Sequence, residues 1–227
     1  MHGGSRPLNS DSLNPPDAIL FDLDGTLVDS EPLHWQSVIT VLEQHGVGAA
    51  AHQLEPPVGW SDGPFWAEMR RRFDLPSTVA ELCEARTHAF ICGMEAEGIT
   101  PTPGVALCLE HLCDRGVTVA LVSASPMKQV MVMLKALGLD GHFACIVSGH
   151  DDTPRNKPHP EPYLNCAERL ALPISACWAV EDSPTGVRSA YAAGARVFAL
   201  AGHDLDPDVT PLIFAHLGSV GELVKWV

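Results

Sequence analysis

The stretch Phe21–Glu31, FDLDGTLVDSE, sets two carboxylates two positions apart where a short apolar run ends in a glycine turn. The run Ala18–Phe21 is typical of a buried strand, and Gly25 permits a sharp exit from it. Asp22 and Asp24 are therefore expected at the carboxyl end of this strand, the edge where open α/β sheets bind ligands. The same residues also fit a plain acidic turn, because Asp forms local hydrogen bonds with its own backbone.

Length and composition indicate an ordinary soluble globular protein. The chain has 227 residues, of which 46% are hydrophobic, enough for one large domain or a domain with a smaller partner. No apolar stretch approaches the roughly 20 residues that cross a bilayer, so no membrane contact is expected. Residues 1–16 lack the apolar centre of a secretory signal and are expected to be a flexible leader, either native or added for expression.

The charge argues against a polyanionic partner. The 28 acidic and 14 basic residues give a formal charge of −14, which would repel nucleic acid. The only basic run, Arg70–Arg72, is interpreted as the solvated face of a helix. A chain this acidic would need a cation to bind a small phosphate, so a divalent metal is plausible before any motif is considered.

The chain has seven cysteines, an odd number, with no C-x-x-C pair. Several lie inside apolar runs, as Cys145 does in FACIV and Cys177 in CWAV, where a thiol behaves as a small core side chain. This usage is typical of a reducing compartment, so we expect a cytoplasmic protein.

Short apolar runs and helix-like segments alternate along much of the chain. Such alternation predicts an α/β fold with a doubly wound parallel sheet that carries helices on both faces. The expected strands are Ala18–Phe21, Val117–Val122, Phe143–Val147, Cys177–Val180 and Arg196–Leu200. The expected crossover helices are Gly104–Asp114, Pro126–Leu137, Pro160–Leu170 and Pro184–Ala193.

About ninety residues with few strand signals separate the first run from the second, too many for an ordinary connection. We therefore expect a helical unit, residues 31–98, inserted into a core domain of residues 17–30 and 99–227. Its helices are expected at His34–Gln44, Asp62–Phe73 and Thr78–Glu97, separated by the connections HGVGAA, EPPVGWSDG and DLPS. The segments 28–31 and 98–104 would serve as its hinges.

Three further polar features follow predicted strands. Ser123-Ala124-Ser125-Pro126 starts a helix whose free N–H groups suit an oxyanion, although the serines could merely cap that helix. Lys157 lies in NKPHPEPY, and an isolated lysine of this kind is usually a surface residue. The motif VEDSP holds a second acidic pair, 181–182, which alone would be interpreted as a helix N-terminal cap.

The four features are chemically complementary. Carboxylates from two strands could hold Mg²⁺ through hard oxygen ligands. Lysine, serine and amide N–H groups could bind the other oxygens of a phosphoryl group, and the remaining carboxylates could supply a nucleophile and a proton-transfer group. The combination favours phosphoryl transfer over a set of unrelated turns and caps.

The stretches FDLDGTLVDSE, VSAS, NKPHPEPY and VEDSPTGVRSA occur in this order between Phe21 and Ala190. They resemble the four motifs of the haloacid dehalogenase superfamily, in particular its phosphatases and β-phosphoglucomutase-like enzymes with a helical cap inserted after the first strand. The resemblance implies a Rossmann-like core and covers nearly everything after the leader. SEPLHW, VSASP and NKPHPEPYLNCA are further similar to bacterial hexitol and 2-deoxyglucose-6-phosphate phosphatases, which suggests sugar or sugar-alcohol phosphates as the substrate class.

The resemblance implies roles for the acidic residues. Asp22 would attack phosphorus and form a transient aspartyl phosphate, while Asp24 would protonate the leaving oxygen and then activate water. Mg²⁺ would be bound by the Asp22 side chain, the Asp24 backbone carbonyl and the Asp182 carboxylate, with Glu181 in or next to that shell. Dehalogenases of the superfamily lack the second aspartate of the first motif, so Asp24 argues against their chemistry.

The resemblance implies phosphate binding for the other core motifs. Ser123 and the Ala124 amide would hold phosphoryl oxygens, and Lys157 would screen the charge between the phosphate and Asp22. We expect the partner to be a small phosphorylated metabolite and the enzyme to be a monomer.

Only the residues of the cap can distinguish a phosphatase from a sugar phosphomutase, because both enzymes use the same aspartyl-phosphate intermediate. His34 matches a cap histidine of β-phosphoglucomutase and of related phosphatases, and it is interpreted as either a substrate or proton-relay residue or a helix-surface or interdomain hydrogen bond. The mutase has an arginine just after its glycine-x-serine loop, where this chain has Asp62, and a carboxylate there would repel a second phosphate. Similarly, Met127 stands where the mutase has a polar sugar contact.

A Mg²⁺-dependent phosphatase is therefore the favoured function. Trp60, Ser61 and Ser125 are candidate substrate contacts, whereas Phe65 and Trp66 fit the core of the cap better than a substrate platform. One alternative is a β-phosphoglucomutase-like phosphomutase. Another is a non-catalytic phosphate-responsive module, although receivers of that kind carry their aspartate after the third strand and have no helical insertion.

Overall fold

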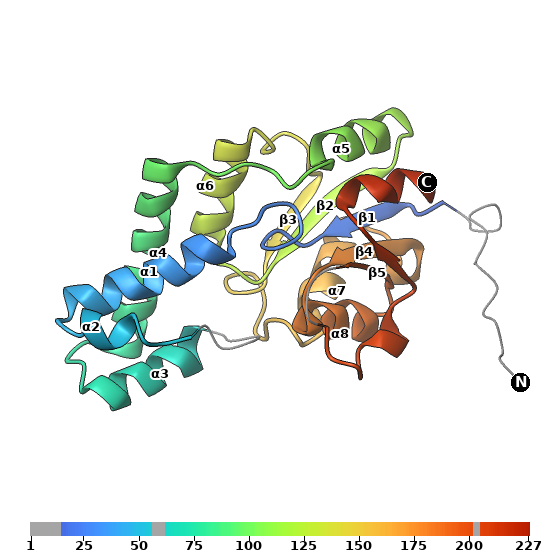
Figure 1. The fold of residues 1–227 in the computed structure, drawn as a ribbon. Helices are drawn as coiled ribbons and strands as arrows, with labels where there is room; N and C mark the ends of the chain where they lie inside the picture. Colours follow the sequence, from blue (N-terminus) through green and yellow to red (C-terminus); the bar gives the residue numbers. More distant parts are fainter. Residues whose placement is uncertain (1–14, 56–61, 202–204) are drawn as a thin grey trace, which may run out of the picture.

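The computed structural model describes residues 15–55, 62–201 and 205–227, which contain a six-stranded parallel sheet. The strands lie in the order β3-β2-β1-β4-β5-β6, so β1 is central and the connection from β3 to β4 crosses to its other side (Figure 1). The strands are β1 Ala18–Phe21, β2 Thr118–Ser123, β3 Cys145–Ser148, β4 Cys177–Glu181, β5 Arg196–Leu200 and β6 Ala215–Leu217. The doubly wound α/β fold predicted from the sequence is confirmed.

Helices cover both faces of the sheet and enclose two hydrophobic cores (Figure 1). Their bounds are α5 Val105–Asp114, α6 Met127–Leu137, α7 Glu161–Arg169 and α8 Pro184–Ala193. Alternate residues of β1 enter different cores, because successive side chains of a strand point to opposite faces. Ile19 and Phe21 pack with α5 and α6, whereas Ala18 and Leu20 pack with α7 and α8.

Most predicted elements agree closely with the observed ones, and the exceptions have local reasons. The first helix of the insertion begins at Glu31 rather than His34, because Pro32 is well tolerated in a first helical turn. The edge strand β6 was not predicted, since three residues are too few for a recognisable pattern. Short 3₁₀ helices, also not predicted, lie at Ile174–Ala176, Thr210–Leu212 and Val220–Lys225.

Within the described part of the chain, four of the five helices between β1 and β2 form a unit beside the sheet, called the helical insertion below (Figure 1). They are α1 Glu31–Gln44, α2 Gly48–Ala51, α3 Asp62–Phe73 and α4 Val79–Glu97. They enclose a separate hydrophobic cluster that includes Val38, Leu42, Trp66 and Leu82. The prediction of a plain connection at HGVGAA is wrong, because the alanines that follow Gly48 favour a helical turn there.

The two segments that join the insertion to the sheet are hydrogen-bonded to each other. Thr102 donates its N–H to the Leu27 carbonyl at 2.9 Å and its hydroxyl to the Thr26 carbonyl at 2.8 Å. Val28 and Pro101 form an antiparallel bridge beside these bonds. The segments proposed as hinges are thus paired where they meet the sheet.

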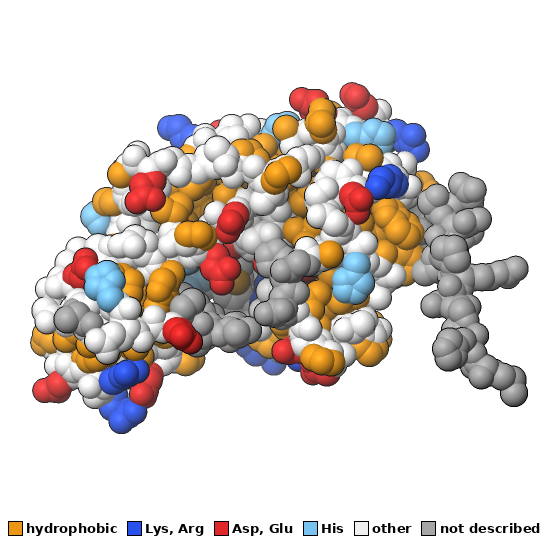
Figure 2. Space-filling view, in the orientation of Figure 1, with side chains coloured by type: hydrophobic (Ala, Val, Ile, Leu, Met, Phe, Trp, Pro, Cys, Tyr) orange, Lys and Arg blue, Asp and Glu red, His pale blue; other side chains and the backbone are white. Residues whose placement is uncertain are grey.

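No helix among the described residues is both long and apolar enough to cross a membrane. On the face seen in Figure 2, Lys and Arg side chains are scattered, and some of them lie over α3. All seven cysteines are free. Residues 1–14 of the expected leader lie outside the described residues.

Candidate active site

The carboxyl ends of β1 and β4 meet where the strand order reverses, which is the usual ligand site of such sheets. Asp22 follows β1, and its N–H donates to the Val180 carbonyl of β4 at 3.0 Å. Glu181 ends β4, and Asp182 follows it. The structure therefore brings three of the predicted carboxylates together, with one oxygen each of Asp22, Glu181 and Asp182 within 4.8 Å of one another.

Lys157 lies between two of these carboxylates. Its Nζ is 2.6 Å from Asp22 Oδ1 and 2.7 Å from Glu181 Oε1, and its side chain is only 3% exposed. The Tyr163 hydroxyl also donates to Glu181. Burial by itself would lower the pKa of Lys157, but Asp22 and Glu181 outweigh burial and raise that pKa, so the ammonium stays charged. The surface interpretation of this lysine does not apply here.

One ammonium does not neutralise two buried carboxylates and a third, half-buried one. Burial raises the pKa of Asp22 well above its usual value; Lys157 opposes this rise, and Glu181 and Asp182 add to it. Burial and Glu181 likewise raise the pKa of Asp182 to about 7, again against the effect of Lys157. Crowded hard oxygens with too little compensating charge suit a divalent cation. The donor set of Asp22, Asp182 and Glu181 therefore fits Mg²⁺.

Gly25 leaves the space that the Asp182 carboxylate occupies. Its φ is +83°, which favours glycine, and a Cβ at this position would lie 1.9 Å from Asp182 Oδ2. Gly25→Ala is therefore expected to displace that carboxylate and to weaken Mg²⁺ binding by about 10-fold or more in isothermal titration. Gly63→Ala, at a position with open space around it, is the control. Unchanged Mg²⁺ affinity in Gly25→Ala would contradict a role for this carboxylate in metal binding.

Asp24 has a separate set of partners. Its Oδ1 accepts hydrogen bonds from the Ser30 hydroxyl at 2.6 Å and from His34 Nε2 at 2.9 Å, and its Oδ2 accepts one from the Ser125 hydroxyl at 2.8 Å. Burial opposes ionisation of Asp24, but His34, Ser30 and Ser125 outweigh burial and lower its pKa well below the usual value. The two aspartates of the first motif therefore differ in proton affinity, with the pKa of Asp22 raised and that of Asp24 lowered.

A ring of hydrogen bonds joins Asp24 to the helical insertion. Arg86 of α4 contacts His34 Nδ1 through Nη1 at 2.7 Å and Gln129 of α6 through Nη2 at 3.4 Å. Gln129 donates to the Ser125 hydroxyl at 3.3 Å, which closes the ring at Asp24. Because arginine only donates, His34 Nδ1 accepts and Nε2 carries the proton toward Asp24. The histidine thus makes a hydrogen bond from the helical insertion to Asp24.

Four residues of this arrangement were not predicted from the sequence. Ser30 and Tyr163 lie inside FDLDGTLVDSE and NKPHPEPY, so membership of these motifs could have marked them. Arg86 and Gln129 lie within ordinary helices, and no local signal distinguishes them. Only tertiary packing brings these two side chains to the site.

The proposed phosphate-binding residues lie at the end of β2, the strand beside β1. Ser123 is fully buried, and its hydroxyl accepts a hydrogen bond from the Ser125 N–H at 3.0 Å. Asn156 donates its side-chain amide to the Ala124 carbonyl at 2.8 Å. This bond ties the segment that carries Lys157 to the loop after β2, so the two predicted phosphate-binding segments are neighbours.

The substrate contacts predicted in the insertion are described only in part. Trp60 and Ser61 lie outside the described residues. Phe65 and Trp66 are buried in the hydrophobic cluster of the insertion, in agreement with the core interpretation. Asp62, at the start of α3, places its Oδ2 2.9 Å from Arg86 Nη2.

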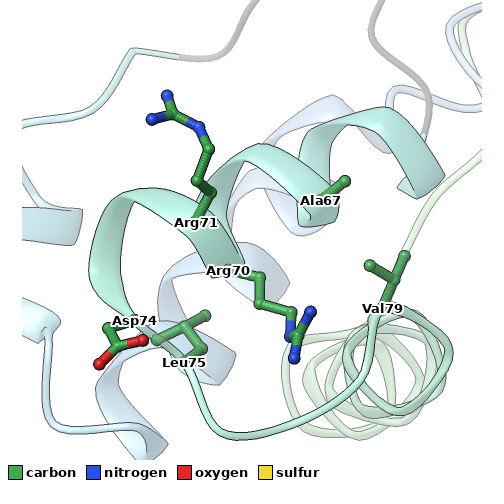
Figure 3. Close-up of a pocket in the computed structure, with 6 residues that line it drawn as sticks. All are labelled: Ala67, Arg70, Arg71, Asp74, Leu75 and Val79. Atoms are coloured by element: carbon green, nitrogen blue, oxygen red, sulfur yellow. The ribbon is translucent and has the colours of Figure 1, made fainter.

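A surface pocket lies toward the other end of α3, away from Asp62 (Figure 3). It is lined by Ala67, Arg70, Arg71, Asp74, Leu75 and Val79. Arg71 forms an exposed pair with Glu68 on its own helix, and its side chain points away from Arg70. Exposed ion pairs of this kind contribute little to the free energy of unfolding. The pair agrees with the prediction that this run forms the solvated face of a helix. The pocket is therefore not a candidate active site.

Comparison with known proteins shows which family this chain belongs to. The family model described as haloacid dehalogenase-like hydrolase matches residues 19–200. The chain is 33% identical to hexitol phosphatase A of Escherichia coli (strain K12) over 182 residues, which cover 80% of this chain and 81% of that protein. It is 31% identical to a phosphoglycolate phosphatase of Xanthomonas campestris pv. campestris (strain 8004) over 196 residues, which cover 85% of this chain and 87% of that protein.

A solved structure shares the fold. CbbY from Rhodobacter sphaeroides, crystallised in complex with phosphate, has a TM-score of 0.74 at 24% identity, covering 92% of this chain and 96% of that chain. At this identity the likeness concerns the fold alone. The family match and the two phosphatase relatives show that this chain is an enzyme of the haloacid dehalogenase-like hydrolase family.

Proposed function

We propose that this enzyme is a Mg²⁺-dependent phosphatase that hydrolyses small phosphate monoesters through an aspartyl-phosphate intermediate. The observation that carries the proposal is the pairing of the buried Lys157 ammonium with Asp22, beside the Asp182 carboxylate. A nucleophile, a fixed positive charge and oxygen ligands for a cation then belong to one group of side chains. The phosphatase names of the relatives support the same chemistry.

Asp22 is the proposed nucleophile. A carboxylate oxygen forms a bond to phosphorus while the bond to the leaving oxygen breaks, and the leaving oxygen takes up a proton. Lys157, hydrogen-bonded to Asp22, favours the ionised carboxylate that this attack requires. The Ser123 hydroxyl and the Ala124 N–H are proposed to hold other phosphoryl oxygens, which fixes the phosphorus in line with the nucleophile.

Asp24 is the proposed proton-transfer group. In the described conformation, hydrogen bonds from Ser30, His34 and Ser125 stabilise its ionised form, which is the form that activates water to hydrolyse the intermediate. Donation of a proton to the leaving oxygen requires the protonated form. Substrate binding must therefore weaken some of these hydrogen bonds in the first step, and the bond from His34 is the one that comes from the insertion.

Mg²⁺ is the cation proposed for the acidic cluster, because all the ligands offered are hard oxygens. The Asp22 and Asp182 side chains, which form one acidic cluster with Glu181, would hold it, together with the Asp24 backbone carbonyl that the family resemblance implies. Bound there, the ion would neutralise negative charge on the phosphoryl oxygens.

The helical insertion is proposed to act as a cap domain, residues 31–98, on a core domain of residues 17–30 and 99–227. The bonds from His34 to Asp24 and from Arg86 to Gln129 support this proposal, because they join side chains of the insertion to residues beside the proposed site. The proposed substrates are cytoplasmic sugar or sugar-alcohol phosphates. A phosphomutase would need a second phosphate site in the insertion, and the carboxylate of Asp62 works against one.

Phosphate release from p-nitrophenyl phosphate, measured with and without Mg²⁺, tests the proposal. Turnover that requires the metal is expected, and the absence of metal-dependent turnover would contradict the proposal. Conversion of β-glucose 1-phosphate to glucose 6-phosphate faster than phosphate release would favour a phosphomutase. A stable phosphoprotein formed from acetyl phosphate without turnover would favour a binding module.

Mg²⁺ is expected to stabilise the protein more at pH 8 than at pH 5.5. Burial and Glu181 raise the pKa of Asp182 to about 7, so the folded state keeps a proton that the unfolded state loses near pH 4. Without metal, stability therefore falls as the pH rises through this window, and above it protons no longer compete with Mg²⁺. At 100 times its dissociation constant the ion should raise the melting temperature by about 5–10 °C at pH 8. Equal shifts at both pH values would contradict Asp182 as a ligand.

A further inference from the structure

A buried arginine of the insertion lies near the proposed site with its charge already compensated. Arg86 has only 4% of its side chain exposed, and it contacts His34, which in turn contacts Asp24. Its Nη2 is 2.9 Å from Oδ2 of Asp62. Arginine stays protonated in proteins, so the pair places one positive and one negative charge side by side with no net charge.

Without Asp62, this arginine would attract a second anionic group on a bound phosphate ester. The planar guanidinium matches the oxygens of a carboxylate or phosphate. Burial limits the screening of its charge by water. Arg86 Nε is buried and has no hydrogen-bond partner among the described residues, so the hydrogen-bonding capacity of the guanidinium is not fully used there.

We propose that Asp62 determines substrate specificity by neutralising Arg86. The enzyme then selects monophosphates whose remaining part is uncharged, such as polyol and sugar phosphates, over esters that carry a carboxylate or a second phosphate. The inference rests on the proposed phosphatase function. It refines the expectation of direct repulsion by Asp62, because the structure shows this carboxylate held by Arg86.

Membership of the family does not decide this preference. The relatives of the chain include a phosphatase named for hexitols, whose phosphates have an uncharged tail, and one named for phosphoglycolate, whose tail is a carboxylate. The Arg86–Asp62 pair of this chain is therefore the observation on which the preference is argued.

The test compares kcat/KM for sorbitol 6-phosphate, 2-phosphoglycolate and fructose 1,6-bisphosphate in the wild-type enzyme with Mg²⁺. The substrate with the uncharged tail should be preferred by about 10-fold or more. Asp62→Asn keeps the side-chain size and removes the charge, so it should raise the ratio of kcat/KM for charged over uncharged tails by about 10- to 50-fold. Adding Arg86→Gln to Asp62→Asn should cancel this rise.

Glu68→Gln is the matched control, because Glu68 also lies on α3 and pairs with an arginine, Arg71, but at an exposed site. It should leave the ratio unchanged, and Asp62→Glu, which keeps the charge, should retain the wild-type ratio. A ratio that Asp62→Asn does not move would overturn the proposal. If that variant does not fold, the wild-type preference decides, and a preference for charged tails overturns the proposal.

Turnover of p-nitrophenyl phosphate by the wild type distinguishes the two possible failures. If the wild type hydrolyses p-nitrophenyl phosphate, an unchanged kcat/KM ratio in Asp62→Asn contradicts only the proposed role of Asp62. When this turnover is absent, the failure is that of the phosphatase function.

Discussion

Asp22→Asn is expected to lower kcat for p-nitrophenyl phosphate by about 10⁴-fold or more while leaving the fold intact. The amide keeps the size of the carboxylate but is too weak a nucleophile to attack phosphorus. The stability of the metal-free protein should not fall, because burial, Glu181 and Asp182 raise the pKa of Asp22 more than Lys157 lowers it, and Lys157 keeps its ion pair with Glu181 in this variant. Steady-state kinetics and melting curves without metal measure the two effects.

Asp29→Asn is the control for this variant, since Asp29 is exposed in the same stretch of chain. Its turnover and melting temperature should match those of the wild type. If Asp22→Asn kept about a tenth of the wild-type turnover or more, another group or a water molecule would have to attack phosphorus, and the assignment of the nucleophile would be wrong.

Lys157→Met is expected to have the largest effect on stability. The substitution leaves Asp22 and Glu181 without the ammonium that lies 2.6 and 2.7 Å from their oxygens. Removing one partner of a buried ion pair lowers the free energy of unfolding by about 3–5 kcal/mol, and turnover should fall by about 10³-fold because a fixed positive charge is lost. Urea denaturation without metal measures the loss of stability.

Mg²⁺ should restore part of the stability of Lys157→Met, because a cation between the carboxylates replaces some of the missing charge. Lys135→Met, at an exposed position of α6, is the control and should lie within about 0.5 kcal/mol of the wild type. A Lys157→Met protein as stable as the wild type would show that the buried ion pair is absent or contributes nothing.

The residue ranges of most strands of the sheet could be predicted from the sequence because these strands are buried on both faces. Ala18–Phe21 and Val197–Leu200 are continuous apolar runs, and the observed strands Ala18–Phe21 and Arg196–Leu200 match the predicted bounds. β6 and α2 could not be found in this way, since β6 has three residues at the edge of the sheet and α2 is a single turn. Elements this short depend on contacts with their neighbours more than on their own pattern.

The residues of the site differ in the same way, because some lie in local sequence motifs and others do not. Asp22, Lys157 and Asp182 lie in local motifs that follow strands, so their positions along the chain were enough to suggest that they meet. Arg86 and Gln129 are 43 positions apart on two helices, and only the packing of α4 against α6 joins them. Pairing of this kind leaves no trace in local sequence, which is why the link from the insertion to Asp24 could not be predicted.

Mass spectrometry of the enzyme quenched with acid during its first turnover tests the central claim most directly. With Mg²⁺ and p-nitrophenyl phosphate, one added phosphoryl group is predicted on the wild-type chain, localised by fragmentation to Asp22 and absent from Asp22→Asn. Without Mg²⁺ the adduct should not form. Turnover without an adduct, or an adduct on another residue, would contradict Asp22 as the nucleophile and with it the proposed mechanism of this site.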